Sequence, residues 1–108
     1  MELKELKKRA VEIREKYADL EIKKYGKTWT PSQMAQGFAG DVGDLMKLVM
    51  AKEGIREIEN ADEKLQHELA DCLYSIFVLA DKYKVDLEKS FLKTMDELDD
   101  RIAKEAKR

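Results

Sequence analysis

The sequence has few of the residues that interrupt helices or cross-link small folds. It contains one proline, five glycines and one cysteine in 108 residues. So few turn formers argue against a β-sandwich or barrel, and the lone Cys72 cannot form an internal disulfide. No apolar stretch has the length of a membrane span or the placement of a signal peptide. We therefore expect a cytoplasmic protein with no membrane partner.

An excess of charge of one sign is also missing. Lys and Arg number 21 against 23 Asp and Glu, which gives a formal net charge of −2. Proteins that bind DNA or RNA usually carry a strong positive surface, so no nucleic-acid polymer is expected as a partner. Charged residues make up 41% of the sequence and hydrophobic residues 44%. This balance is typical of amphipathic helices, and the length fits one all-α domain over residues 1–108.

Apolar residues repeat at helical spacing in four segments, and capping residues mark where three of them begin. Thr30, with Gln33 three residues later, predicts a capping box. Asn60 with Glu63 predicts a second one, and Asp86 predicts the cap of the last helix. The predicted helices cover residues 2–24, 31–52, 61–83 and 87–102.

Glycines are expected to have two different roles. Gly26 and Gly54 follow the first and second helical patterns and predict the helix ends. Gly37, Gly40 and Gly43 instead fall inside the second pattern at three-residue spacing. Because glycine is costly within a helix, we interpret these three as positions where another helix approaches closely, with the second helix continuing through them.

The third predicted helix is apolar over most of its circumference between Leu69 and Ala80. A helix of this kind is normally buried on several sides, which one small chain can hardly provide. A second copy of the chain would complete the core. We therefore expect a four-helix bundle completed by homodimerisation, as a homodimer or a dimer of dimers.

Two acidic pairs occur within these apolar surroundings: Asp41 with Asp44, and Glu68 with Asp71. The three-residue spacing puts both carboxylates of a pair on one helix face. At an effective dielectric of about 20, two carboxylates about 5 Å apart repel by roughly 3 kcal/mol, so a cation is needed if they converge. Antiparallel packing would bring all four together, and oxygen ligands suit Mg²⁺ or Mn²⁺ better than zinc. The alternative is four solvated acids, or acids paired with Lys47 and Lys64.

These motifs resemble the signature of the MazG-like all-α nucleoside triphosphate pyrophosphohydrolases, which is E-x-x-E on one helix and E-x-x-D on the next. Asp41-Val42-Gly43-Asp44 and Glu68-Leu69-Ala70-Asp71 stand at the corresponding places, and the resemblance runs from about Trp29 to Arg101. It implies a MazG-like fold and hydrolysis of a (d)NTP to (d)NMP and pyrophosphate in nucleotide-pool house-cleaning, with Mg²⁺ or Mn²⁺. The implied catalytic residues and metal ligands are Asp41, Asp44, Glu68 and Asp71.

The sequence departs from this family pattern in places. Both acids of the first motif are Asp rather than Glu. Gly40 stands where many members have an additional Glu, and Leu98 stands where many have an Asn that helps to bind nucleotide. Lys93 and Arg101 resemble the basic positions nearby, which implies contacts to phosphate. The departures leave open an alternative function, a non-catalytic helical dimer that acts as a nucleotide-binding or interaction module.

Three other side chains have both a functional and a structural interpretation. Trp29 could stack on a nucleobase or fill a packing gap. Lys47, one turn after Asp44, could reach a phosphate or form a surface ion pair. His67 precedes Glu68 and points about 100° away from it, so a surface histidine is favoured over a metal ligand. The candidate substrate-binding residues are Trp29, Lys47, Lys93 and Arg101.

Overall fold

The computed structural model describes residues 2–108, which form four α-helices and no strand. No helix in this range is both long and apolar enough to cross a membrane. The all-α prediction is confirmed, and the last helix is longer than expected. The helices are α1 (Leu3–Tyr25), α2 (Pro31–Lys52), α3 (Ala61–Lys82) and α4 (Leu87–Ala106).

Side-chain caps start two of the helices as predicted. The Thr30 hydroxyl accepts a hydrogen bond from the backbone N–H of Gln33 at 3.3 Å, and the Gln33 side chain accepts one from the N–H of Thr30 at 2.9 Å. Asp86 accepts from the N–H of Lys89 at 3.1 Å. The capping box predicted at Asn60 is wrong, because Asn60 is left-handed with φ 56° and its side chain makes no cap hydrogen bond. Capping side chains act from the extended region.

Glycine ends the first helix and follows the second, as predicted. Gly26 has φ 78°, and its N–H donates to the carbonyl of Ile22 at 2.9 Å. Gly54 has φ 79° and lies two residues beyond Lys52, where α2 stops. Glycine has no Cβ to clash in this left-handed conformation, so both positions can turn the chain out of a helix.

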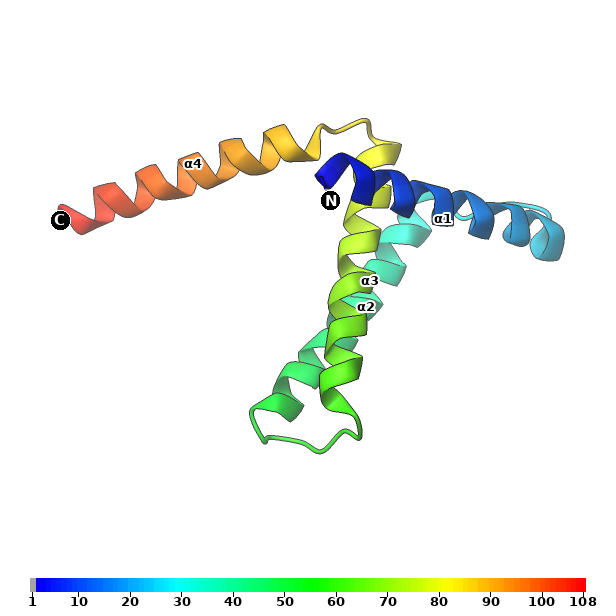
Figure 1. Ribbon diagram of the computed structural model, residues 1–108, viewed down its shortest axis with the longest axis horizontal. Helices are drawn as coiled ribbons and strands as arrows, with labels where there is room; N and C mark the ends of the chain where they lie inside the picture. The colour runs from blue at the N-terminus through cyan, green and yellow to red at the C-terminus, as the bar shows by residue number, and fades with distance from the viewer. Residues whose placement is uncertain (1) are drawn as a thin grey trace.

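α2 and α3 form an antiparallel hairpin, and α1 lies across the end of it that is far from the α2–α3 loop (Figure 1). α1 makes most of its contacts with α3. The core is small, and no large side chain within residues 2–108 is completely buried. The buried apolar residues are Ala10, Met34, Leu48, Cys72, Phe77, Val78 and Ala80.

The three glycines inside α2 do not interrupt the helix, but only one of them meets a close neighbour. A Cβ added at Gly37 would lie 3.3 Å from Cζ3 of Trp29. A Cβ added at Gly40 or Gly43 would meet nothing within 4 Å. The prediction of a close helix approach is therefore wrong for Gly40 and Gly43 within the chain, and the approach at Gly37 is by the Trp29 ring.

α4 extends away from the other helices and makes no substantial contact with them (Figure 1). None of its residues is buried, and its apolar stripe is open to solvent. The expected four-helix bundle is therefore not closed within one chain, because the fourth apolar stripe lies on none of the other three helices. The stripe consists of Phe91, Met95, Leu98 and Ile102.

This arrangement gives the chain an extended shape and a large surface. The accessible surface is 8791 Å², whereas a compact monomer of this mass exposes about 6,200 Å². The radius of gyration is 17.4 Å, against about 13 Å for a compact domain of this length. Part of the excess is a second apolar stripe on α3, formed by the exposed residues Leu69, Leu73 and Ile76.

Candidate active site

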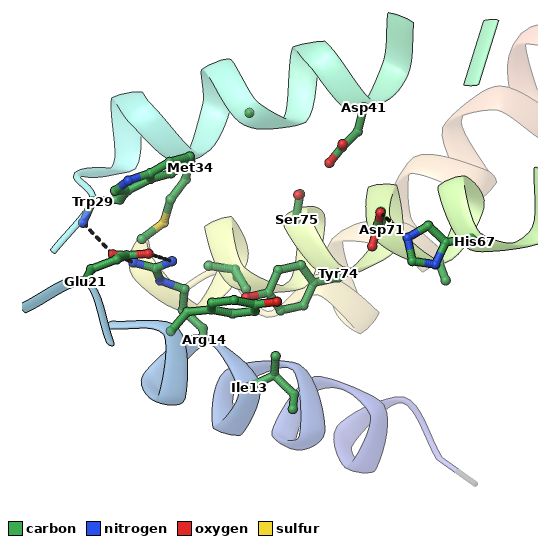
Figure 2. A pocket seen from close by; sticks show the side chains of 14 residues that line it. Ile13, Arg14, Glu21, Trp29, Met34, Asp41, His67, Asp71, Tyr74 and Ser75 are labelled. Atoms are coloured by element: carbon green, nitrogen blue, oxygen red, sulfur yellow. Dashed lines mark hydrogen bonds and ion pairs between the residues drawn. The ribbon is translucent and has the colours of Figure 1, made fainter. Parts of the chain in front are cut away.

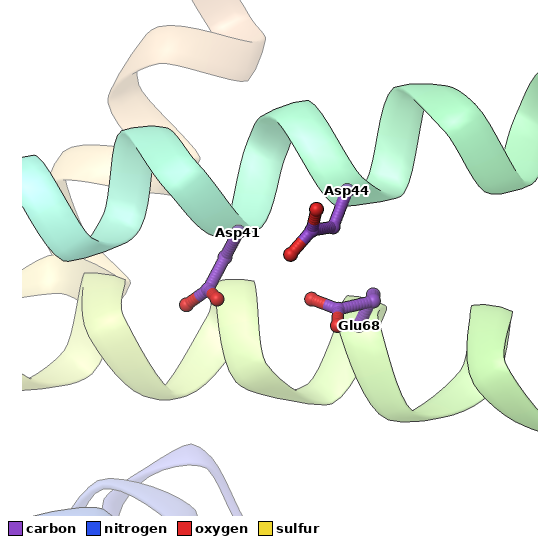
Figure 3. Close-up of side chains that lie close together, drawn as sticks. All are labelled: Asp41, Asp44 and Glu68. Atoms are coloured by element: carbon purple, nitrogen blue, oxygen red, sulfur yellow. The ribbon is translucent and has the colours of Figure 1, made fainter.

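Three carboxylates from the two arms of the hairpin meet near its middle (Figure 3). Asp41 and Asp44 come from α2 and Glu68 from α3, and one oxygen of each lies within 4.8 Å of the others. The three-residue spacing on α2 turns both aspartates toward α3, and the antiparallel packing puts Glu68 opposite them. We call these three residues the carboxylate cluster.

Of the charged groups that act on the carboxylate cluster, the exposed His67 lowers the pKa values of Asp41 and Glu68, and the neighbouring carboxylates raise them. Burial raises the pKa of Asp41, and the negative charges of Asp71 and Asp44 raise it further. Burial likewise raises the pKa of Glu68, followed by the charges of Asp41 and Asp71. Oε2 of Glu68 is buried and accepts no hydrogen bond. A buried oxygen without a donor costs free energy, and a cation beside it removes this cost.

No lysine or arginine within residues 2–108 forms an ion pair with the cluster. The alternative prediction, in which Lys47 and Lys64 neutralise these acids directly, is therefore not met. An all-oxygen group that is partly buried and pairs with no lysine or arginine has the ligand chemistry that hard divalent cations prefer. The residues present thus fit Mg²⁺ or Mn²⁺.

Asp71 stands at the edge of this group rather than within it. Its Oδ2 lies 3.0 Å from Nε2 of His67, one helical turn earlier. The His67 side chain is 73% exposed, as predicted for a surface histidine. Its contact with Asp71 was not predicted, although the four-residue spacing accounts for it. Asp71 therefore borders the cluster and is partly engaged by the imidazole.

A cavity of about 700 Å³ opens next to the cluster, between α1, α2 and α3 (Figure 2). Trp29, Tyr17 and Tyr74 supply aromatic surface to it, and Asp41 and Asp71 lie where it meets the cluster. Its volume is in the range of small-molecule sites. We call it the aromatic cavity.

A smaller cavity of about 360 Å³ lies on the side of the cluster toward the α2–α3 loop. Lys47 and Lys64 line it together with Asp44 and Glu68. We call it the lysine cavity. The cluster thus lies between a larger aromatic space and a smaller one in which the two lysines face Asp44, Glu63 and Glu68.

The two basic candidates on α4 lie elsewhere in the single chain. Lys93 and Arg101 belong to a helix that makes no substantial contact with α2 or α3. Both side chains are exposed. The chain alone therefore does not bring them to the carboxylates.

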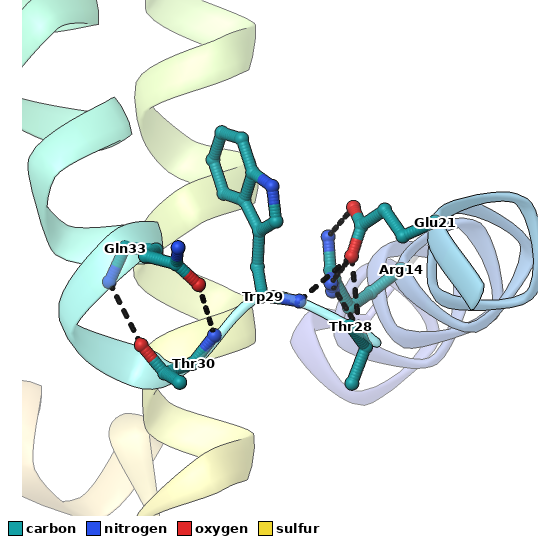
Figure 4. A network of polar contacts seen from close by, with 6 residues as sticks. All are labelled: Arg14, Glu21, Thr28, Trp29, Thr30 and Gln33. Carbon is teal, nitrogen blue, oxygen red and sulfur yellow. Dashed lines mark hydrogen bonds and ion pairs between the residues drawn. The ribbon is translucent and has the colours of Figure 1, made fainter. Parts of the chain in front are cut away.

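One polar network beside the aromatic cavity was missed from the sequence (Figure 4). The Arg14 guanidinium donates to both oxygens of Glu21, at 2.9 and 2.6 Å, and to the Thr28 hydroxyl at 2.9 Å. The Thr28 hydroxyl and the backbone N–H of Trp29 each donate to Oε1 of Glu21 at 2.9 Å. We call Arg14, Glu21 and Thr28 the clamp. A signal was present, since Arg14 and Glu21 are seven residues apart and therefore share one face of a helix.

The clamp predicts a specific loss of stability in acid. The hydrogen bond from Arg14, the largest cause, lowers the pKa of Glu21 from 4.5 to about 2. The stabilisation by the carboxylate is complete above pH 4.5 and is lost as the pH falls toward 2. It corresponds to about 3 kcal/mol. In urea unfolding, Glu21→Gln should lower the free energy of unfolding at pH 7 by about this amount and have little effect near pH 2.

The matched control is Glu12→Gln, which removes an exposed carboxylate 3.7 Å from Arg9. Exposed pairs contribute little, so this variant should change the free energy of unfolding by less than about 1 kcal/mol. A Glu21→Gln effect of equal size at pH 7 and pH 2 would contradict the prediction.

A comparison with protein families accords with the all-α hairpin and its acidic site. The model of the MazG nucleotide pyrophosphohydrolase domain matches residues 30–104, which include α2, α3 and both acidic motifs. The chain therefore belongs to the MazG nucleotide pyrophosphohydrolase family, and the resemblance found in the sequence is confirmed. Comparisons with curated proteins and with solved structures give no match.

Proposed function

We propose that this protein hydrolyses a (d)NTP to (d)NMP and pyrophosphate, as a house-cleaning enzyme of the nucleotide pool. The observation that carries the proposal is the carboxylate cluster, which lies without a lysine or arginine ion pair beside a ligand-sized cavity in a chain of this family. Asp41, Asp44, Glu68 and Asp71 are the proposed catalytic residues. The test is pyrophosphate release from a panel of (d)NTPs with Mg²⁺ or Mn²⁺.

The proposed cofactor is Mg²⁺ or Mn²⁺, held by the carboxylate cluster with Asp71 at its edge. Such an ion neutralises phosphate charge and lowers the pKa of a water that attacks phosphorus. The chain supplies anionic oxygens on two packed helices, which fixes them before ligand binding. The shorter aspartates of the first motif still approach Glu68 within 4.8 Å.

The two cavities suggest how the nucleotide is oriented. The aromatic cavity is suited to the base, because Trp29 can stack on it, and stacking contributes about 1–3 kcal/mol per base. The lysine cavity is suited to the terminal phosphates, which Lys47 and Lys64 would attract as point charges. The triphosphate would then cross the cluster between them.

A homodimer, or a dimer of dimers, is part of the proposal. The exposed stripes of α3 and α4 need cover, and the surface in excess of a compact monomer, about 2,600 Å² per chain, is ample for a stable interface. If α4 packs on a second copy of the chain, Lys93 and Arg101 would also approach a nucleotide bound there. Binding of nucleotide without pyrophosphate release would instead support the non-catalytic alternative, which the residues Gly40 and Leu98 favour.

Metal binding should stabilise the fold. At a concentration one hundred times the dissociation constant, a ligand adds about 2.7 kcal/mol, and for a domain of this size Tm should rise by about 10 °C. The rise should be smaller at pH 5 than at pH 7.5, because the raised pKa values of Asp41 and Glu68 let protons compete. Thermal unfolding followed by circular dichroism measures this effect.

The control is the exposed acidic pair Glu97 and Asp100 on α4, which has the same three-residue spacing. Glu97→Gln with Asp100→Asn should keep the full metal effect, whereas Asp44→Asn with Glu68→Gln should remove it. An equal rise of Tm in both double variants would mean that the ion binds elsewhere.

A further inference from the structure

The clamp lies in a part of the chain that the proposed reaction does not use. Arg14 and Glu21 belong to α1 and Thr28 to the α1–α2 connection, all before the family match begins at residue 30. Arg14 is 9% exposed. Besides stabilising the fold, a buried ion pair of this kind can hold one geometry in preference to others. The geometry it holds is that of Trp29.

Trp29 is fixed from three directions. Its backbone N–H donates to Glu21 at 2.9 Å. The next residue, Thr30, is fixed by its capping box with Gln33. The indole lies on α2 where residue 37 is glycine, with Cζ3 3.3 Å from the position that a Cβ would take. Figure 4 shows the indole between the clamp and the start of α2.

We propose that Glu21 is a positioning residue of the candidate active site: paired with Arg14, it holds the Trp29 indole as a wall of the aromatic cavity. Glu21 does not touch the carboxylate cluster, and it acts through the ring that it places. Arg14 and Glu21 line the same cavity as Trp29, so the clamp lies beside the ring that it holds. That the occupant of this cavity is a nucleobase rests on the proposed function, but the placement of Trp29 does not.

Intrinsic fluorescence tests the placement without any substrate. Trp29 is the single tryptophan, so its emission and its quenching by acrylamide report directly on this ring. Thr28→Val removes the hydroxyl that bonds to both Arg14 and Glu21, and Glu21→Gln removes the charge that holds Arg14. Both variants should shift emission to the red and increase quenching, with the far-UV circular dichroism unchanged. If Glu21→Gln does not fold, Thr28→Val carries the test.

A second pair of variants moves the ring from the opposite side. Gly37→Ala places a methyl against the indole and should change the emission while the clamp is intact. Gly40→Ala is the matched control, since its methyl meets nothing within 4 Å and both changes favour the helix. Glu12→Gln is the control for loss of charge on α1.

Activity then separates positioning from a general structural role. With a (d)NTP that the protein hydrolyses, Thr28→Val, Glu21→Gln and Gly37→Ala should raise KM by about fivefold or more and leave kcat near the parent value. Unchanged emission and quenching in folded Thr28→Val and Glu21→Gln would overturn the proposal, as would a loss of kcat at constant KM. A change in fluorescence without hydrolysis by any variant or the parent would support the placement and reject the proposed function.

Discussion

Glu68→Gln is expected to abolish metal-dependent pyrophosphate release, with a loss of kcat of at least about a hundredfold. Glu68 is the one cluster residue contributed by α3, and its Oε2 is buried with no hydrogen-bond donor. The amide has nearly the same shape but neither the negative charge nor the affinity for a hard cation. The loss should therefore arise from the missing ligand rather than from a change of fold.

The thermal stability of Glu68→Gln without metal is an independent test of the same site. Because burial and the neighbouring Asp41 charge raise the pKa of Glu68, its ionised form destabilises the native state at pH 7. The neutral amide of Glu68→Gln should relieve this repulsion, so in EDTA the variant should have a higher Tm than the parent protein. In excess Mg²⁺ the parent protein should have the higher Tm. Glu97→Gln on α4 is the control and should retain both activity and metal response. Pyrophosphate release by Glu68→Gln within a few fold of the parent would exclude the cluster as the active site.

Replacing Phe91 and Leu98 together by Asp should convert the assembly to monomers and abolish activity. Both side chains lie on the exposed stripe of α4 and would be buried against a second copy in the proposed homodimer. Two carboxylates in an apolar interface without partners cost several kcal/mol each, which should dissociate the proposed dimer. Light scattering coupled to size-exclusion chromatography measures the mass, and pyrophosphate release is assayed on the same fractions.

Lys89→Asp is the control, because it adds a carboxylate to α4 away from the stripe. It should leave the mass and the activity unchanged. A parent protein that is monomeric yet fully active would reject the dimer, and with it the approach of Lys93 and Arg101 to the nucleotide through a second chain.

Local patterns in the sequence predicted the elements well, because each depends on neighbouring residues. The box of Thr30 and Gln33 formed as expected, since both partners are three residues apart. The same pattern failed at Asn60, where the entry of α3 from the α2–α3 loop requires a left-handed residue. Backbone direction there is set by the hairpin, which a three-residue pattern does not contain.

The site was predictable where it depends on helix faces. The spacing and the apolar surroundings of the two motifs together predicted that Asp41, Asp44 and Glu68 converge if α2 and α3 pack antiparallel. Spacing could not show that Asp71 contacts His67 instead, because that choice is made by side-chain rotamers. The sequence pattern also did not show that α4 extends away from the other helices. An apolar stripe predicts that a helix face is buried, but it does not tell which chain buries it.

Because the apolar face of α4 is not buried within its own chain, the assembly of the protein should depend on its concentration. If α4 packs on a second copy, mass action governs how many chains have a complete core, and specific activity should fall on dilution below the dimer dissociation constant. The connection before α4, residues 83–86, would then be the first segment open to proteases in a dilute sample. Expression level would thus act on this protein twice, through the number of chains and through the fraction of them that is assembled.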